Sequence, residues 1–255
     1  MSVLQELQAV RDWIAQAQRI AVLTGAGMSA ESGVPTFRDA QTGYWAQFNP
    51  QDMASERGFR AAPQRVWDWY AHRRGGIAAV QPNAGHIALA EFAQAHPGRL
   101  TVITQNVDGL HQRAGSAGVL CLHGDLMQDR WLEAPRACCR LENAEPGSPP
   151  RCRSCGNLVR PGVVWFGENL PVDVLEAAEQ AAQAAELMLV VGTAGAVYPA
   201  AGLAHQARQA GARVVVINPA ASELDSAAHI VLRGTAAQLL PMLLQGGAVA
   251  TKDKP

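Results

Sequence analysis

Three small residues that follow a short apolar segment have the spacing of a turn that binds a dinucleotide. The apolar segment covers residues 20–23, and Gly25, Gly27 and Ala30 match the pattern G-x-G-x-x-G/A. The first glycine permits a tight turn between strand and helix, the second lets backbone N–H groups approach a pyrophosphate, and a small third residue allows close helix packing. Turns of this composition also occur without a ligand, so the spacing alone leaves both possibilities open.

Polar residues follow other apolar segments as well. His123 comes directly after one of them, and its imidazole, with an ordinary pKa near about 6.5, can accept a proton at neutral pH. Asn106 follows another, and its side-chain amide can both donate to and accept from ribose hydroxyls or ordered water. A single histidine is more often structural than catalytic, so the assignment of His123 as a base needs support from its context.

Four of the five cysteines are concentrated in one stretch of the chain. Cys152 and Cys155 have the C-x-x-C spacing of a zinc ribbon, whereas Cys138 and Cys139 are adjacent. Side chains of adjacent residues tend to diverge, and no histidine lies between residues 124 and 204 to complete a ligand set. Three arrangements remain open: a remodelled zinc site of four cysteines, three cysteines with water or a carboxylate, and no zinc.

The remaining pattern predicts the elements that must position these residues. Val-, Ile- and Leu-rich segments typical of strands buried on both faces alternate with segments of helical periodicity, which indicates a doubly wound α/β fold with a parallel sheet. Ligands in such folds bind beyond the carboxyl ends of the strands, where the polar residues are expected to gather. The predicted strands are 20–23, 100–103, 119–122, 187–191, 214–217 and 230–232, and the predicted helices are 1–19, 84–95, 172–185, 199–210 and 235–244.

Two segments interrupt this alternation. One is rich in Trp, Tyr and Arg and the other in Pro, Arg and Cys, and we expect both to form a smaller module. The chain is thus predicted to be a single domain with a large Rossmann-like part, about 1–34, 77–127 and 162–245, and a small helical, zinc-ribbon-like part from insertions at about 35–76 and 128–161.

Size and charge exclude several functions. The 255 residues suit one large domain, and a net charge of −1 gives no electrostatic case for binding nucleic acid or a membrane surface. No run of eighteen apolar residues exists, and the N-terminus lacks the basic start and apolar core of a secretory signal. We therefore expect a cytoplasmic protein, in which thiols stay reduced and clustered cysteines favour a metal over disulfides.

Taken together, the motifs resemble those of the sirtuins, the family of NAD-dependent protein-lysine deacylases, over about residues 20–243. A single motif of this kind is weak evidence for membership of a family, but six motifs in the family's order are very specific evidence. They are GAGMSAESGVPTFR (25–38), TQNVDGLHQRAG (104–115), LHGDL (122–126), RPGVVWFGE (160–168), GTAGAVYPA (192–200) and VINP (216–219).

The resemblance implies that NAD and an extended acyl-lysine peptide bind in a cleft between a Rossmann-like domain and a smaller domain with a zinc ribbon. The implied reaction gives free lysine, nicotinamide and O-acyl-ADP-ribose, with His123 as the base and Asn106 as a second catalytic residue. The residues implied to bind NAD are Gly25, Ala26, Gly27, Ser29, Glu31, Phe37, Arg38, Gln105, Asn106, Asp108, Gly192, Thr193, Asn218 and Ala236.

The resemblance also implies how the substrate is held. An extended segment would pair with the peptide backbone and line the lysine tunnel, and it comprises Val163, Val164, Trp165, Phe166 and Gly167. Tyr70 and Arg73 share one face of a predicted helix and match the Tyr-x-x-Arg of the sirtuins that remove succinyl, malonyl and glutaryl groups. A guanidinium can hold a carboxylate bidentately, so we expect removal of succinyl and malonyl groups together with some acetyl groups. Alternatively, Arg73 faces solvent beside a packed tyrosine.

The chain departs from the family at two places. Trp131 and Ala134 stand where the first cysteine pair is expected, and Ala194 stands where the family commonly has serine. The resemblance therefore leaves open the same three arrangements of the cysteines as the spacing does. Three other functions also stay open: an acetyl-only deacetylase, a noncatalytic module that binds NAD or ADP-ribose, and a Rossmann oxidoreductase. The last is weakened because no acidic residue follows the glycine-rich turn at the distance that a dehydrogenase uses for ribose.

Overall fold

The computed structural model describes residues 2–35 and 48–245, and its centre is a parallel sheet of six strands. The strand order is β3-β2-β1-β6-β7-β8, so the order reverses between β1 and β6, where a doubly wound fold opens a crevice for a ligand. The expected α/β architecture is confirmed. The strands are β1 (Ile20–Thr24), β2 (Leu100–Thr104), β3 (Leu120–Cys121), β6 (Leu187–Val191), β7 (Arg213–Ile217) and β8 (Ile230–Leu232).

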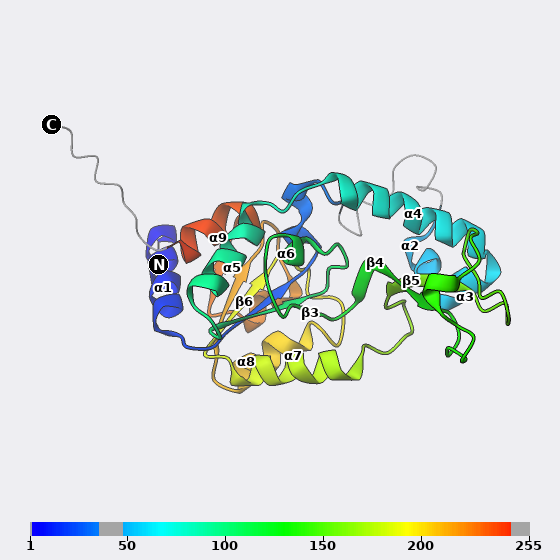
Figure 1. The fold of residues 1–255 in the computed structure, drawn as a ribbon. Helices are drawn as coiled ribbons and strands as arrows, with labels where there is room; N and C mark the ends of the chain where they lie inside the picture. The colour runs from blue at the N-terminus through cyan, green and yellow to red at the C-terminus, as the bar shows by residue number, and fades with distance from the viewer. Residues whose placement is uncertain (1, 36–47, 246–255) are drawn as a thin grey trace.

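Helices cover both faces of this sheet (Figure 1). Val22 and Leu189 face one apolar cluster with α1 (Val3–Gln16), α5 (Ala84–Ala95) and α9 (Ala236–Leu244). The next residues along the same strands, Leu23 and Val190, face a second cluster with α7 (Val172–Ala184) and α8 (Gly202–Gln209). This alternation explains why the strands are continuous apolar runs, since each face needs its own set of side chains.

The turn after β1 differs from the expected start of a helix. Two short 3₁₀ helices, η1 (Ala26–Met28) and η2 (Ala30–Ser32), follow the strand instead. The N–H of Gly27 bonds to the carbonyl oxygen of Gly192 in the neighbouring turn, and Gly33 adopts a φ of +89° that ends the second 3₁₀ helix. The prediction of a helix here was wrong because contacts to the neighbouring turn replace the bonds a longer helix would need.

Two other elements are shorter than expected. The helix expected at 199–210 begins at Gly202, and the strand expected at 119–122 covers only Leu120–Cys121. The described helices also include α6 (Leu110–Arg113) and η5 (Glu223–Ala227), which lie on loops after β2 and β7. No helix within the described ranges is long and apolar enough to cross a membrane.

A third apolar cluster lies away from the main sheet, around the antiparallel pair β4 (Gly124–Trp131) and β5 (Val159–Val163). Figure 1 shows this pair beside the helices of the first interrupting segment. Phe59, Trp69, Tyr70, Leu126 and Trp165 form the centre of the cluster. The first interrupting segment therefore shares a core with residues that flank the second, and Leu132 and Leu158 of the second segment pack against this core. The remaining elements here are α2 (Pro50–Met53), α3 (Glu56–Ala61), α4 (Pro63–Ala79) and η4 (Leu141–Asn143).

Candidate functional site

The turns that follow β1, β2 and β6 are hydrogen-bonded to one another at the carboxyl edge of the sheet. The N–H of Gly25 donates to the carbonyl oxygen of Val191 at 3.0 Å, and the N–H of Gln105 donates to that of Thr24 at 3.0 Å. Because these strands flank the point where the strand order reverses, the three turns form the edge at which a doubly wound fold binds its ligand.

The glycines of these turns are required by their mutual packing. A Cβ on Gly25 would lie 2.7 Å from the Cβ of Thr193, and one on Gly27 would lie 2.8 Å from the Cα of Gly192. Gly192 has a φ of +62°, which disfavours any side chain. The N–H of Gly27 already donates to the carbonyl oxygen of Gly192 at 2.8 Å. The glycine pattern is thus required by the contact between the turns after β1 and β6, before any ligand is considered.

Two other backbone donors at this edge fit a pyrophosphate better. Among the described residues, the N–H groups of Ala26 and Thr193 have no hydrogen-bond partner. They belong to the turns after β1 and β6, which the packing of the glycines holds against each other. Backbone N–H groups at such turns are ready donors to phosphate oxygens. The site therefore fits a dinucleotide through the residues beside Gly25 and Gly27.

Asn106 and Ser29 are fixed by a shared hydrogen-bond network. The amide nitrogen of Asn106 donates to the carbonyl oxygen of Gly25 at 3.0 Å and to Ser29 Oγ at 3.1 Å. The hydroxyl of Ser29 donates to Asp108 at 2.7 Å, and Asp108 also accepts from the N–H of Leu110 at 2.9 Å. Both amide hydrogens of Asn106 are used, so its Oδ1 is the atom left to accept a hydrogen bond.

Two buried histidines lie behind this network. His86 contacts Ser29 Oγ through Nε2 at 3.4 Å, and His111 contacts Thr24 Oγ1 through Nε2 at 3.0 Å. Their rings are 4.8 Å apart. Burial lowers the pKa of His86 to about 4 and that of His111 to about 3. Both rings are therefore neutral at physiological pH and act as hydrogen-bonding supports.

His123 is held in the tautomer that a general base requires. Its Nδ1 lies 2.9 Å from the carbonyl oxygen of Gln105, which can only accept, so Nδ1 carries the hydrogen and Nε2 keeps a lone pair. Burial lowers the pKa of His123, although the bond to Gln105 opposes that shift. The side chain of Gln105 donates to Thr193 Oγ1 at 3.2 Å, which links the base to the turn after β6.

Tyr70 and Arg73 lie on α4 at the junction with the third apolar cluster. Tyr70 is buried, and its hydroxyl accepts a hydrogen bond from Trp165 Nε1 at 3.0 Å. The guanidinium carbon of Arg73 lies 4.9 Å from the centre of the Trp69 ring and 5.8 Å from that of Tyr70. Within the described part of the chain, no hydrogen bond or ion pair joins the Arg73 guanidinium to another group, although the charge of Asp108 favours its protonated form. The two side chains are neighbours, as the spacing predicts.

The expected peptide-pairing segment already uses several of its N–H groups. The N–H of Val164 donates to the carbonyl oxygen of His123, and that of Phe166 donates to Ala54, both at 2.9 Å. The N–H of Trp165 donates to the carboxylate of Glu168 at 2.8 Å. Among described groups, the carbonyl oxygen of Val164 and the N–H of Gly167 are left without a partner. Val163 pairs with Gly124 inside the sheet of β4 and β5.

Other residues implied to bind NAD occupy different positions. Glu31 accepts from the N–H of Ala237 at 2.9 Å, and Ala236 is buried beside it at the start of α9. Asn218 follows β7, and its side chain donates to the carbonyl oxygen of Ala220 at 3.0 Å. Phe37 and Arg38 lie outside the described residues.

Sequence reasoning missed one feature of the site, the ion pair between Arg160 and Glu168. Arg160 is buried, its guanidinium stacks on the ring of Trp165, and it also donates to the carbonyl oxygen of Val163 at 2.8 Å. Glu168 additionally pairs with Arg130 at 2.8 Å. The available signal was the pair of opposite charges that begins and ends the motif RPGVVWFGE.

The four cysteines of the second interrupting segment come together despite their unusual spacing. The sulfur atoms of Cys138, Cys139, Cys152 and Cys155 all lie within 4.8 Å of one another. A tetrahedral zinc with bonds of about 2.3 Å needs sulfur atoms about 3.8 Å apart, and Cys139 and Cys155 are 3.5 Å apart. A turn in which the N–H of Cys139 donates to Arg136 at 2.8 Å lets both adjacent side chains reach the cluster. The donor set therefore fits zinc, and among the three arrangements that the sequence leaves open this geometry favours the remodelled site of four cysteines.

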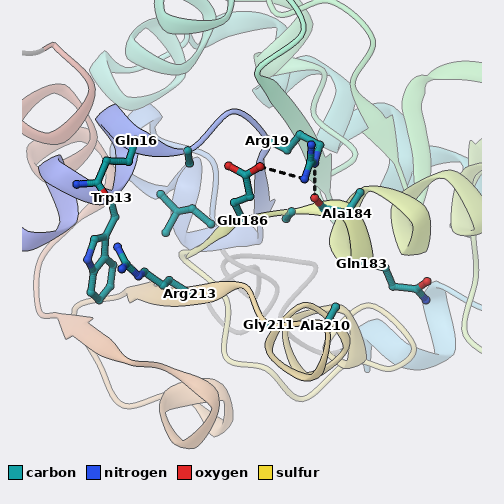
Figure 2. Close-up of a pocket in the computed structure, with 12 residues that line it drawn as sticks. Trp13, Gln16, Arg19, Gln183, Ala184, Glu186, Ala210, Gly211 and Arg213 are labelled. Atoms are coloured by element: carbon teal, nitrogen blue, oxygen red, sulfur yellow. Dashed lines mark hydrogen bonds and ion pairs between the residues drawn. The ribbon is translucent and has the colours of Figure 1, made fainter.

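A separate hollow of about 450 Å³ lies at the opposite edge of the sheet, before β1, β6 and β7 (Figure 2). Arg19 pairs there with Glu186 at 3.0 Å, and the guanidinium of Arg213 lies over the ring of Trp13. Because ligands of doubly wound folds bind at the carboxyl edge, this hollow is distinct from the site described above.

Comparison with known proteins matches residues 25–199 to the Sir2 family model. The chain is 55% identical over 234 residues, 92% of its length and 94% of the relative's, to a protein of Ralstonia nicotianae named NAD-dependent protein deacylase. It is 47% identical to a protein of the same name from Deinococcus radiodurans, over 94% of its own length and 99% of the relative's.

Solved structures give the same result. A Sir2 homolog in complex with NAD superposes with a TM-score of 0.84 at 40% identity, over 93% of this chain and 92% of the other. A Sir2 protein bound to a propionylated peptide superposes with a TM-score of 0.80 at 29% identity, over 94% of this chain and 97% of the other.

Proposed function

This chain belongs to the Sir2 family and is an NAD-dependent protein deacylase, and from that premise we propose that it removes succinyl and malonyl groups from lysine as well as acetyl groups. The observation that carries the acyl preference is the guanidinium of Arg73, which has no ion-pair partner among the described residues and lies over the ring of Tyr70, with its carbon 5.8 Å from the ring centre. Succinyl and malonyl groups end in a carboxylate, whereas an acetyl group does not.

The chemistry of Arg73 favours an anionic acyl group. Burial lowers its pKa, but a guanidinium stays protonated in proteins, so the side chain keeps a positive charge that is poorly solvated. Asp108 compensates the charge of this partly exposed side chain only in part, because desolvation outweighs its attraction, and an incompletely compensated charge is costly. A carboxylate on the substrate supplies that compensation through one or two charge-assisted hydrogen bonds. The guanidinium also lies over the ring of Trp69, with its carbon 4.9 Å from the ring centre, and this cation–π contact helps to keep it in place.

The reacting end of the site uses residues of the main sheet. NAD supplies an electrophilic ribose carbon when its bond to nicotinamide breaks. Nε2 of His123 is placed to accept a proton from a ribose hydroxyl, and Asn106 Oδ1 to accept a hydrogen bond from the ribose. The N–H groups of Ala26 and Thr193 are the proposed donors to the pyrophosphate. The products are the free lysine, nicotinamide and O-acyl-ADP-ribose.

The other sequence-derived site residues remain proposals with the roles given above. Gly25, Gly27 and Gly192 shape the turns, and Ser29 and Asp108 orient Asn106. The remaining proposed contacts with NAD are Glu31, Phe37, Arg38, Gln105, Asn218 and Ala236, and those with the peptide are Val163, Val164, Trp165, Phe166 and Gly167.

Zinc, when bound, would have a structural role held by Cys138, Cys139, Cys152 and Cys155. These residues belong to the segment between β4 and β5, so the metal would tie that excursion together. Four thiolates leave no open position for a substrate, which separates the metal from the chemistry at His123.

We infer that the partners are acylated proteins rather than one dedicated substrate. Solved structures of Sir2 proteins carry acetylated or propionylated peptides. In this chain, the unpaired backbone groups of Val164 and Gly167 support pairing with a peptide backbone, which depends little on side chains. A cytoplasmic location and the lack of nucleic-acid or membrane partners stay predictions from the sequence.

The test is nicotinamide release with NAD and one lysine peptide that carries either a succinyl or an acetyl group. Arg73→Met should lower kcat/KM for the succinyl peptide by about 10- to 100-fold, the worth of a charge-assisted hydrogen bond, and leave the acetyl value within about threefold. Arg57→Met is the matched control, because that arginine is exposed on α3. Equal losses on both peptides would overturn the acyl preference but leave the deacylase intact.

A further inference from the structure

The indole of Trp165 and the hydroxyl of Tyr70 form a buried hydrogen bond that the deacylation chemistry does not use. Trp165 Nε1 lies 3.0 Å from Tyr70 Oη, and both residues are at most 2% exposed. They come from different elements, since Tyr70 lies on α4 and Trp165 follows β5. The bond therefore joins α4, which carries Tyr70 and Arg73, to the segment that follows β5.

The direction of this bond determines where the Tyr70 proton can go. An indole N–H is only a donor, so the hydroxyl oxygen of Tyr70 must accept, and its own hydrogen is left for another acceptor. Within the described residues, that hydroxyl donates to no other group. Burial raises the pKa of Tyr70 to about 12, so the hydroxyl keeps its proton at every physiological pH.

Trp165 is itself fixed by an ion pair. The carboxylate of Glu168 accepts from the backbone N–H of Trp165 at 2.8 Å and is held by the guanidinium of Arg160. That guanidinium lies over the indole ring, with its carbon 3.2 Å from the ring centre. Phe59 packs on the same indole with ring centres 5.2 Å apart. The indole is held by its backbone, by a cation and by an aromatic ring, so its N–H has little freedom to turn away from Tyr70.

We propose that Trp165, held by the Arg160–Glu168 ion pair, is a positioning residue for recognition of the acyl carboxylate, because its indole N–H directs the Tyr70 hydroxyl proton toward that carboxylate beside Arg73. This inference rests on the proposed preference for succinyl and malonyl groups and goes beyond it by naming what orients the phenol. Trp165 acts through Tyr70 and touches the reacting atoms in no step.

A double-mutant cycle of Trp165→Phe and Tyr70→Phe tests the inference. Trp165→Phe removes the N–H, so kcat/KM for a succinyl peptide should fall about five- to tenfold further than that for an acetyl peptide, mainly through a higher KM. Tyr70→Phe should give a similar loss, and the double variant should be no worse than Tyr70→Phe, because the two groups act as one unit.

A second variant distinguishes a loss of the Trp165 N–H from a general loss of packing around Trp165. Glu168→Asp keeps the negative charge beside Arg160 but draws the carboxylate away from the Trp165 N–H, and it should lower the succinyl-to-acetyl ratio in the same direction. If both variants fold and keep the wild-type ratio, or if the losses in the double variant multiply, the inference is wrong. Arg73→Met separates the two proposals. If Arg73→Met selectively lowers kcat/KM for the succinyl peptide but Trp165→Phe has no effect, only this inference is wrong. If the wild-type enzyme has no activity on the succinyl peptide, both proposals are wrong.

Discussion

The Nδ1 atom of His123 and the carbonyl oxygen of Gln105 are 2.9 Å apart, although the two residues follow different strands of the sheet. This contact fixes the imidazole tautomer, since a carbonyl oxygen can only accept, and it leaves Nε2 as the free base. Gln105 is in turn bonded to Thr193, so one residue connects the base, the turn after β2 and the turn after β6. The geometry of the base is thus set by the same turns that we propose bind the dinucleotide.

The first prediction concerns the acid limb of the pH profile. Burial lowers the pKa of His123, and the neutral ring is the active form, so the acid limb of kcat/KM for an acetyl peptide should have its midpoint below pH 6.5. The acetyl peptide is chosen because it has no titrating acyl group. An acid limb at or above pH 6.5 that disappears on changing another residue would contradict the assignment of His123. His123→Ala should abolish turnover at every pH.

The sequence predicts the main sheet well because its pattern is strong. Strands buried on both faces must be apolar throughout, and residues 187–191 and 214–217 meet this requirement without ambiguity. His123 and Asn106 are also predictable, because polar residues directly after buried strands must lie at the carboxyl edge.

The glycine-rich turn and the cysteine segment were harder to predict for a physical reason. The chemistry of Gly27 depends on a turn after residue 191 that is far away in the sequence, and no local pattern shows that its N–H is already used. The convergence of Cys138 and Cys139 depends on a bond to Arg136 in an irregular segment without periodicity. The bond between Trp165 and Tyr70 is also a long-range contact, between residues 95 positions apart.

The two buried histidines predict a loss of stability in acid. An unfolded chain binds a proton on each histidine near pH 6.5, whereas the folded chain does so only near pH 4 for His86 and pH 3 for His111. As the pH falls from 6.5 to 4, the free energy of unfolding should therefore drop by about 1.4 kcal/mol per pH unit for each histidine. Urea denaturation at several pH values measures the slope. His86→Gln and His111→Gln should each flatten it by about one proton, and unchanged slopes in both would contradict the argument.

The cysteine cluster predicts one zinc ion per chain. Metal analysis of the purified protein should find it, and removal by a chelator should lower the Tm by more than about 5 °C, because the segment between β4 and β5 loses its link. Cys155→Ser should have the same effect. Cys121→Ser is the matched control, since that thiol lies outside the cluster and its loss should leave the zinc in place. A metal-free protein whose Tm does not respond to added zinc would refute this prediction.

The last prediction separates the packing role of the glycines from their supposed contact with the cofactor. Gly192 has a φ of +62° and lies against the backbone of Gly27 and Met28, so Gly192→Ala should lower the free energy of unfolding by about 2–4 kcal/mol even without NAD. Gly118 has a nearly equal φ of +63° with open space around it, so Gly118→Ala measures the cost of the backbone conformation alone, about 1 kcal/mol. The excess cost at Gly192 is then the cost of separating the turns after β1 and β6. If both variants lose the same stability and only NAD binding distinguishes them, the glycine serves the cofactor rather than the contact between the turns.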